Sequence, residues 1–162
     1  MGSAVTGLKA GLVAGVAYGV IAAILSYVSL LGLKSAIMSS IQKALPANSP
    51  ITADQVYQIA LVIAPVAAVI VGILGGLLLG AIYGWVVERI PGRSFVIKGL
   101  FFGLVLWFIF SVLVGAANLE YGLLDYLSGL ATGIVPAVVF GAILGYLYGR
   151  LLPKPEPAPA QL

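Results

Sequence analysis

Few side chains in this sequence could take part in chemistry. The chain has five acidic and eight basic residues, and it contains neither histidine nor cysteine. Without histidine, the chain lacks the commonest metal ligand and the commonest proton shuttle. Without cysteine, it can form neither disulfides nor thiolate metal sites. No serine can be activated by a histidine. We therefore predict a protein that is not an enzyme, with no catalytic residue, no metal site and no cofactor.

The remaining polar side chains give two candidate sites. Asn118, Glu120 and Asp125 could form an external cation site, although a solvated loop explains them more simply. Hydroxyl groups inside apolar segments could line a polar path, although such groups usually bond back to helix carbonyls. The candidates for a polar path are Tyr18, Ser26, Ser111 and Thr132.

The composition places these residues in lipid. Hydrophobic residues make up 62% of the 162-residue chain and charged residues 8%, against about 25% charged residues in an ordinary soluble domain. So few polar groups could not cover the apolar surface of a soluble globule. We therefore predict an integral protein of the cell membrane.

Four apolar runs are long enough to cross a bilayer, which takes about 20 residues. They lie at about 10–33, 66–88, 97–117 and 127–149, and they predict an all-α protein with one four-helix transmembrane domain over residues 1–152. Segment 34–57 is expected outside, with a short interfacial helix. Thr52 and Gln55 form a capping-box pattern that predicts a helix from Ala53, which Pro65 is expected to kink.

Positive charge predicts the orientation of the spans. Six cations fall on one side of the predicted membrane, and this side is expected to be cytoplasmic. Both termini are then cytoplasmic, and residues 153–162 form a proline-rich cytoplasmic tail. The six cations are Lys9, Arg89, Arg93, Lys98, Arg150 and Lys154.

Glycine recurs at every fourth position in the apolar runs. Small residues let helix backbones approach closely in lipid, where water does not drive apolar helices together. These stripes predict glycine zippers, either within one bundle or between protomers. The predicted helix-packing residues are Gly7, Gly11, Gly15, Gly19, Gly72, Gly76, Gly80, Gly84, Gly99, Gly103, Gly133, Gly141, Gly145 and Gly149.

The glycine stripes also indicate an internal repeat. The pattern G-x-x-Y-G occurs at residues 15–19, 80–84 and 145–149. In addition, G-A-I-Y-G-W-V-V-E-R-I-P from Gly80 matches G-A-I-L-G-Y-L-Y-G-R-L-L-P from Gly141. We interpret the four spans as two duplicated helical hairpins that form parallel repeats.

Aromatic residues have two expected roles. Tyr83, Trp85, Tyr146 and Tyr148 lie near the cytoplasmic ends of their spans, where amphipathic rings anchor a helix at the interface. The third span is rich in aromatic residues and carries a short glycine stripe. We expect it to be a more peripheral helix that faces lipid.

Part of the sequence resembles known membrane families. From Gly80 to Trp107 the chain reads G-A-I-Y-G, then P-G, then K-G-L-F-F-G-L-V-L-W. This stretch is similar to several families of small, uncharacterised multipass membrane proteins of prokaryotes. The resemblance implies a membrane location and a compact helical bundle, and it implies no activity.

These observations favour a non-catalytic role. The leading interpretation is a structural or accessory subunit of a homo-oligomer or of a larger membrane complex. The alternative is a small channel or carrier for a small or weakly polar solute. A membrane enzyme acting on lipid comes last, because it would need a polar cluster. The expected partners are membrane lipid and other membrane subunits, and not nucleic acid.

Overall fold

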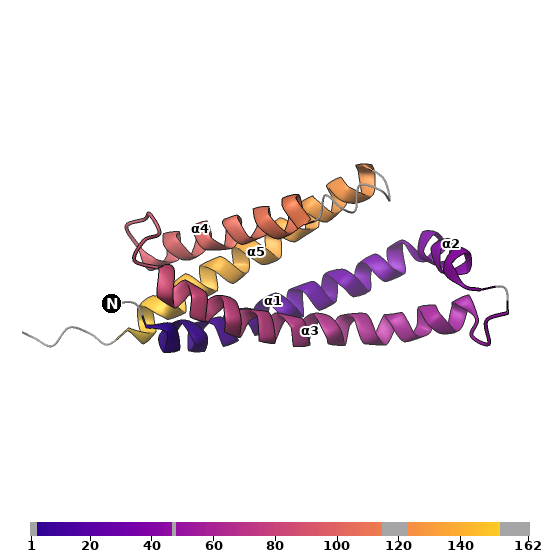
Figure 1. The fold of residues 1–162 in the computed structure, drawn as a ribbon, viewed down its shortest axis with the longest axis horizontal. Helices are drawn as coiled ribbons and strands as arrows, with labels where there is room; N and C mark the ends of the chain where they lie inside the picture. Colours follow the sequence, from indigo (N-terminus) through magenta and orange to yellow (C-terminus); the bar gives the residue numbers. More distant parts are fainter. Residues whose placement is uncertain (1–2, 47, 115–122, 153–162) are drawn as a thin grey trace, which may run out of the picture.

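The protein is all-α in a computed structural model that describes residues 3–46, 48–114 and 123–152. The α-helices are α1 (Ala4–Gly32), α2 (Lys34–Ala44), α3 (Ala53–Val86), α4 (Phe95–Trp107) and α5 (Leu123–Leu151) (Figure 1). A π-helical segment, η1 (Phe108–Val114), continues α4. No strand occurs within these described ranges.

Four of the helical segments are long and apolar enough to cross a membrane. They are Ala4–Gly32, Ala53–Val86, Phe95–Val112 and Gly133–Leu151. The predicted all-α class is confirmed, as is the presence of four helices of membrane-spanning length and composition. The helices extend beyond some of the expected spans, since α1 begins at Ala4 and α3 at Ala53.

Side-chain caps define where the helices begin. The Thr52 side chain accepts a hydrogen bond from the backbone N–H of Gln55, and the Gln55 side chain accepts one from the backbone N–H of Thr52. The predicted capping box is therefore confirmed. Ser3 caps α1 and Ser94 caps α4 in the simpler one-sided way. Such caps satisfy backbone donors that have no partner inside the helix.

Segment 34–57 contains a helix, as the spacing of its apolar residues predicted. This helix, α2, has no buried residue, and its position in the membrane interface stays a prediction. The next helix, α3, continues through Pro65 and has 34 residues. At 1.5 Å per residue it is roughly 50 Å long, which exceeds a hydrocarbon core of about 30 Å. The kink at Pro65 also stays a prediction.

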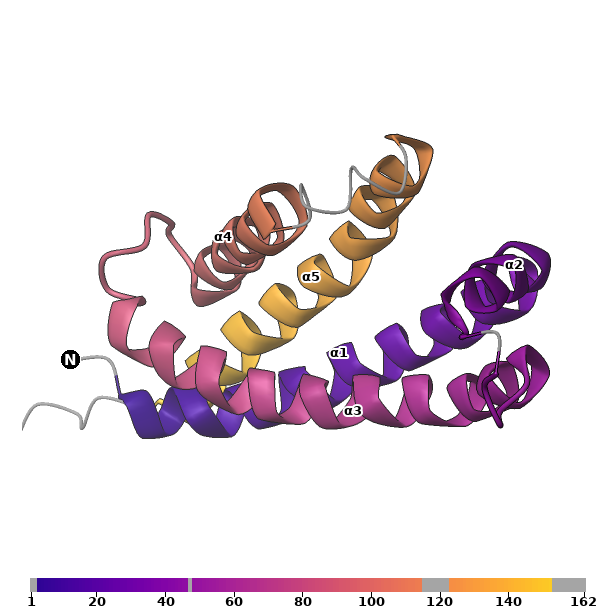
Figure 2. The same ribbon diagram turned by 45° about the vertical axis from the view of Figure 1, so that its right-hand side comes forward.

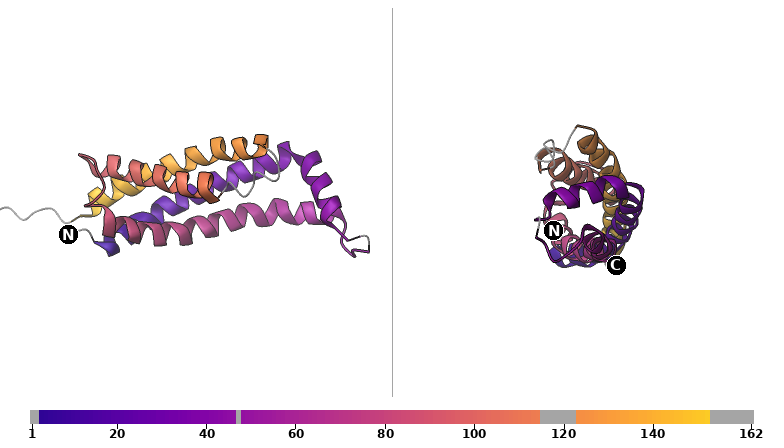
Figure 3. Two further views of the ribbon diagram at one scale, coloured as in Figure 1. Left: turned by 45° about the horizontal axis from the view of Figure 1, so that its top comes forward. Right: turned by 90° about the vertical axis from the view of Figure 1, so that its right-hand side faces the viewer.

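The helices form two antiparallel hairpins. The first hairpin pairs α1 with α3, the second pairs α4 with α5, and contact between α1 and α5 joins them. The hairpins meet near the N-terminus and diverge toward the end that carries α2 (Figures 1 and 2). Figure 3 shows α1 running beside α3, and α1 also contacts α5 of the second hairpin. The backbone turns from α3 toward α4 at Gly92, whose φ of 147° disfavours a side chain.

A small core fills the end where the hairpins meet. Buried residues come from all four long helices, and Tyr83 and Tyr148 are fully buried among them. The core cluster consists of Ala10, Ala14, Tyr83, Val87, Phe102, Phe140, Leu144 and Tyr148. The bundle is therefore closed at one end and open at the other.

The expectation that Tyr83 and Tyr148 anchor the protein at the interface was wrong. Both rings lie between helices, where they contact each other, so they cannot sit among lipid headgroups. For Trp85 and Tyr146, anchoring at the interface stays a prediction. Trp85 is 70% exposed and Tyr146 48% exposed, and each ring lies beneath an arginine guanidinium.

The third span has two distinct faces. Phe101, Phe108 and Phe110 are exposed, as expected for a helix that faces lipid. Gly99 and Gly103 are buried on the opposite face, against α5. The helix is therefore peripheral on one side only.

Candidate functional site between the two hairpins

The glycines of the first hairpin face one another in reciprocal pairs. Gly7 lies against Gly80, Gly11 against Gly76, and Gly15 against Gly72. A methyl group on Gly11 would lie 2.6 Å from the Cα atom of Gly80. Because the opposing atoms belong to the backbone, no side chain could move aside to make room.

The second hairpin repeats this arrangement. Gly99 and Gly141 face each other reciprocally, and Gly103 faces the carbonyl oxygen of Ala137. A methyl group on Gly99 would lie 2.7 Å from the Cα atom of Gly145. Both hairpins therefore pair their helices through direct backbone contact.

The other predicted packing glycines also lie against neighbouring helices. Gly19 approaches the backbone of Val69, and Gly84 approaches that of Ala4. Gly133 and Gly149 differ, because their nearest neighbours on the facing helix are side chains. For Gly133 these are Ser111 and Trp107, and for Gly149 the neighbour is Phe95.

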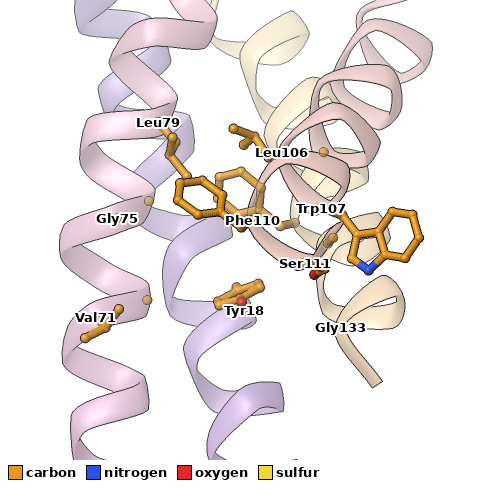
Figure 4. A pocket seen from close by; sticks show the side chains of 14 residues that line it. Tyr18, Val71, Gly75, Leu79, Leu106, Trp107, Phe110, Ser111 and Gly133 are labelled. Carbon is orange, nitrogen blue, oxygen red and sulfur yellow. The ribbon is translucent and has the colours of Figure 1, made fainter. Parts of the chain in front are cut away.

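A cleft of about 270 Å³ lies where the two hairpins diverge (Figure 4). One wall comes from α3 and the other from α4 and η1, while α1 and α5 contribute Tyr18 and Phe140. The described lining residues carry no charge. They are Tyr18, Val71, Gly72, Gly75, Gly76, Leu79, Gly103, Leu106, Trp107, Phe110, Ser111, Gly133, Ala137 and Phe140.

Two hydroxyl groups face this apolar cleft. Tyr18 lies at the middle of α1, and its ring meets Phe140 edge to face with 6.1 Å between centroids. Ser111 lies on the opposite wall, on η1. Neither hydroxyl forms a hydrogen bond with any residue that the structure describes. The indole N–H of Trp107, by contrast, donates to the carbonyl oxygen of Leu130 at 3.2 Å.

The wall that carries Ser111 has an unusual backbone. Phe110 and Ser111 belong to η1, where the helix adopts the wider π form. π-Helical segments are rare, and they frequently occur at functional sites. The distortion of this helix therefore coincides with the cleft.

The facing wall is smooth because of Gly75. A methyl group added at Gly75 would meet no atom within 4 Å, whereas one added at Gly76 would collide with the backbone of α1. These adjacent glycines thus have different surroundings. Gly76 touches the partner helix, while Gly75 leaves the cleft open.

A family model described as Family of unknown function (DUF6789) matches residues 1–158. The chain belongs to this family. No curated protein and no solved structure matches the chain. The DUF6789 match carries no assigned activity, in agreement with the resemblance to uncharacterised membrane families that the sequence indicated.

The structure brings together only part of the polar path suggested by the sequence. Tyr18 and Ser111 both line the cleft, whereas Ser26 is not among its described lining residues. The side chain of Thr132 lies outside the described residues, as does the suggested cation site of Asn118, Glu120 and Asp125. Within the described part of the chain, no group of three or more acidic residues could hold a metal ion.

The sequence did not point to Gly75 as a residue of this site. One signal was available for Gly75, because it falls outside the four-residue stripe of Gly72, Gly76 and Gly80. An extra glycine beside a stripe indicates a second smooth face on the same helix.

Proposed function

We propose that this chain is a non-catalytic membrane protein that serves as a structural or accessory subunit of a homo-oligomer or larger membrane complex. The observation that carries this proposal is an exposed ridge on α3. Its residues recur at every fourth position, the spacing with which helix ridges pack into the grooves of another helix. The ridge consists of Val62, Val66, Ile70, Leu74, Leu78 and Ile82.

The glycine contacts support the same proposal. We take them to be glycine zippers that assemble each hairpin within one chain, with the α3 ridge then available to neighbouring subunits. The zipper interpretation is supported by the reciprocal contacts of Gly11 with Gly76 and of Gly99 with Gly141. Close backbone packing of this kind is a recognised source of helix association in lipid.

We also propose that the hairpins arose by duplication. Both consist of two antiparallel helices that meet through glycines spaced by four residues, and both end in a buried tyrosine, Tyr83 or Tyr148. The proposed location is the cell membrane with both termini in the cytoplasm. In support, Ser3 and Tyr148 lie within hydrogen-bonding distance, so the two ends of the described chain are on one side of the bundle.

The mass of the particle in native membrane discs tests the subunit role. The proposal predicts a defined oligomer, or a fixed ratio to another membrane protein. Replacing Leu74 and Leu78 by tryptophan should break that assembly, because the bulky rings would disrupt the ridge. The matched substitution Ile24→Trp, on an exposed position of α1, should leave it intact. A particle that is always a single chain would contradict the proposal.

A second candidate function is the binding and carriage of a small, weakly polar solute. The specific observation in its favour is the cleft, with the hydroxyl groups of Tyr18 and Ser111 on apolar walls. Solute flux into vesicles that contain the purified protein tests carriage. A flux that matches that of protein-free vesicles for every neutral solute tried would contradict it.

A further inference from the structure

We infer that the cleft between α3 and α4 binds a neutral, lipid-soluble carbonyl compound, and that a quinone is the class that fits best. This inference deepens the second proposed function, since it names the kind of molecule that the cleft would hold. It starts from the hydroxyl groups of Tyr18 and Ser111, which face the cleft without a hydrogen-bond partner among the described residues.

Hydroxyl groups in an apolar environment need a partner. Leaving such a group unpaired in an apolar medium is unfavourable, because the hydroxyl loses the hydrogen bonds that it makes in water. Both hydroxyls can donate to a carbonyl oxygen, which needs no proton of its own. A ligand that carries a carbonyl group would therefore satisfy the cleft better than a pure hydrocarbon would.

The depth of Tyr18 in the membrane excludes an ordinary phospholipid as the source of the carbonyl oxygen. Tyr18 lies at the middle of α1, a helix of membrane-spanning length. The hydrocarbon core is about 30 Å thick, so the ester groups of a phospholipid lie roughly 15 Å from the midplane. A molecule that dissolves completely in the hydrocarbon can bring a carbonyl group to this depth.

The charge and shape of the cleft further restrict the class of ligand that it can bind. The described lining carries no charged residue, so the ligand must be neutral. The aromatic side chains of Tyr18, Phe110 and Phe140 offer surfaces on which a flat ring can pack. Opposite them, Gly75 leaves a smooth backbone surface with no side chain in the way. These features suit a planar carbonyl ring.

The cleft suits a ring better than a whole lipid. Its volume of about 270 Å³ is small beside pockets of roughly 300–1,000 Å³ that enclose drug-sized ligands. Two rim residues are strongly exposed, Val71 at 65% and Phe110 at 58%. A ring could therefore enter sideways from lipid, leaving an alkyl chain in the bilayer.

Trp107 provides the probe for a binding experiment. The chain has two tryptophans, so Trp85→Phe leaves Trp107, which lines the cleft, as the only indole. This variant is reconstituted in phosphatidylcholine vesicles and titrated with a benzoquinone that carries a short alkyl chain. We expect quenching of Trp107 fluorescence that saturates, above a linear component from random collisions.

Matched variants assign the quenching to the cleft. Gly75→Leu fills the cleft and should remove the saturable component. Gly32→Leu is the control, because Gly32 also has open space but lies at the outer end of α1; it should leave the component unchanged. Tyr18→Phe with Ser111→Ala removes both hydroxyls while nearly preserving shape, and it should weaken binding about tenfold.

The inference is overturned if quenching rises linearly in every variant, or if Gly75→Leu still shows the saturable component. A second experiment uses phosphatidylcholine with brominated acyl chains, which quench Trp107 if they enter the cleft. If it quenches Trp107 in a Gly75-dependent way and the quinone does not displace it, acyl chains occupy the cleft and the inference is wrong. The variant Tyr18→Phe with Ser111→Ala tests the inference independently, even if leucine at position 75 disturbs the fold. Quinone binding as tight as in the Trp85→Phe parent would overturn the inference. Binding without flux would refute carriage and leave this inference standing.

Discussion

The rings of Tyr83 and Tyr148 meet edge to face, with 5.3 Å between their centroids. Each hydroxyl reaches the first helix of the opposite hairpin. Tyr83, on the first hairpin, donates to the carbonyl oxygen of Phe95 on the second at 2.9 Å. Tyr148, on the second hairpin, accepts from the backbone N–H of Ser3 on the first at 2.9 Å. This crossed pair joins the two hairpins where the bundle is closed.

Removing either hydroxyl should weaken that junction. Tyr83→Phe and Tyr148→Phe keep the ring contact and delete one partly buried hydrogen bond each, so each should lower the free energy of unfolding by about 0.5–1.5 kcal/mol. Reversible unfolding in mixed micelles measures this change. The control is Tyr146→Phe, at a half-exposed ring, which should change little. If Tyr83→Phe and Tyr148→Phe had the same free energy of unfolding as the control Tyr146→Phe, the two hydroxyls would not stabilise the junction.

The orientation can be tested because the chain contains no cysteine. Single cysteines at Pro91 and Asn48, both exposed, report opposite ends of α3. A membrane-impermeant thiol reagent added to intact cells should label Asn48→Cys and leave Pro91→Cys unlabelled until the membrane is opened. This result follows from the positive charge clustered on the Pro91 side. The reverse labelling pattern would invert the proposed topology.

The capping box at the start of α3 makes a local prediction. Thr52→Ala removes the side-chain acceptor for the backbone N–H of Gln55, which should cost about 1 kcal/mol. Hydrogen exchange should speed up in the first turn of α3 and stay unchanged near Gly76. Ser40→Ala, on the exposed helix α2, is the control. Unchanged exchange at residues 53–56 would show that the box contributes nothing.

Hydropathy and local signals were sufficient to predict most of the helices. The four long apolar helices follow from run length, and the start of α3 follows from the Thr52–Gln55 pair. These features depend on residues close together in the chain, so a single sequence contains them. The glycine spacing likewise marked which face of each helix is smooth.

The sequence could not determine how the two hairpins are inclined to each other. That inclination depends on packing between distant residues such as Ala10, Phe140 and Tyr148, all of which belong to the core where the hairpins meet. The cleft exists because the hairpins diverge from this core, so the sequence could place Tyr18 and Ser111 on one polar path but could not predict the apolar cleft that they line. The burial of Tyr83 and Tyr148 was missed for the same reason.

Direct backbone contact between glycines joins α1 to α3, and two neighbouring residues of α3 test this contact. Alanine at Gly76 would collide with the backbone of α1, whereas alanine at Gly75 meets open space. Gly76→Ala should therefore lose about 1–3 kcal/mol of unfolding free energy through overpacking. Gly75→Ala should gain up to about 1 kcal/mol from better helix propensity.

The decisive measurement is the free energy of unfolding of these two variants, side by side in the same micelles. We predict changes of opposite sign, with Gly76→Ala less stable and Gly75→Ala more stable than the original chain. If Gly76→Ala were as stable as Gly75→Ala, α1 and α3 could not be held together by their glycine backbones, and the account would be wrong.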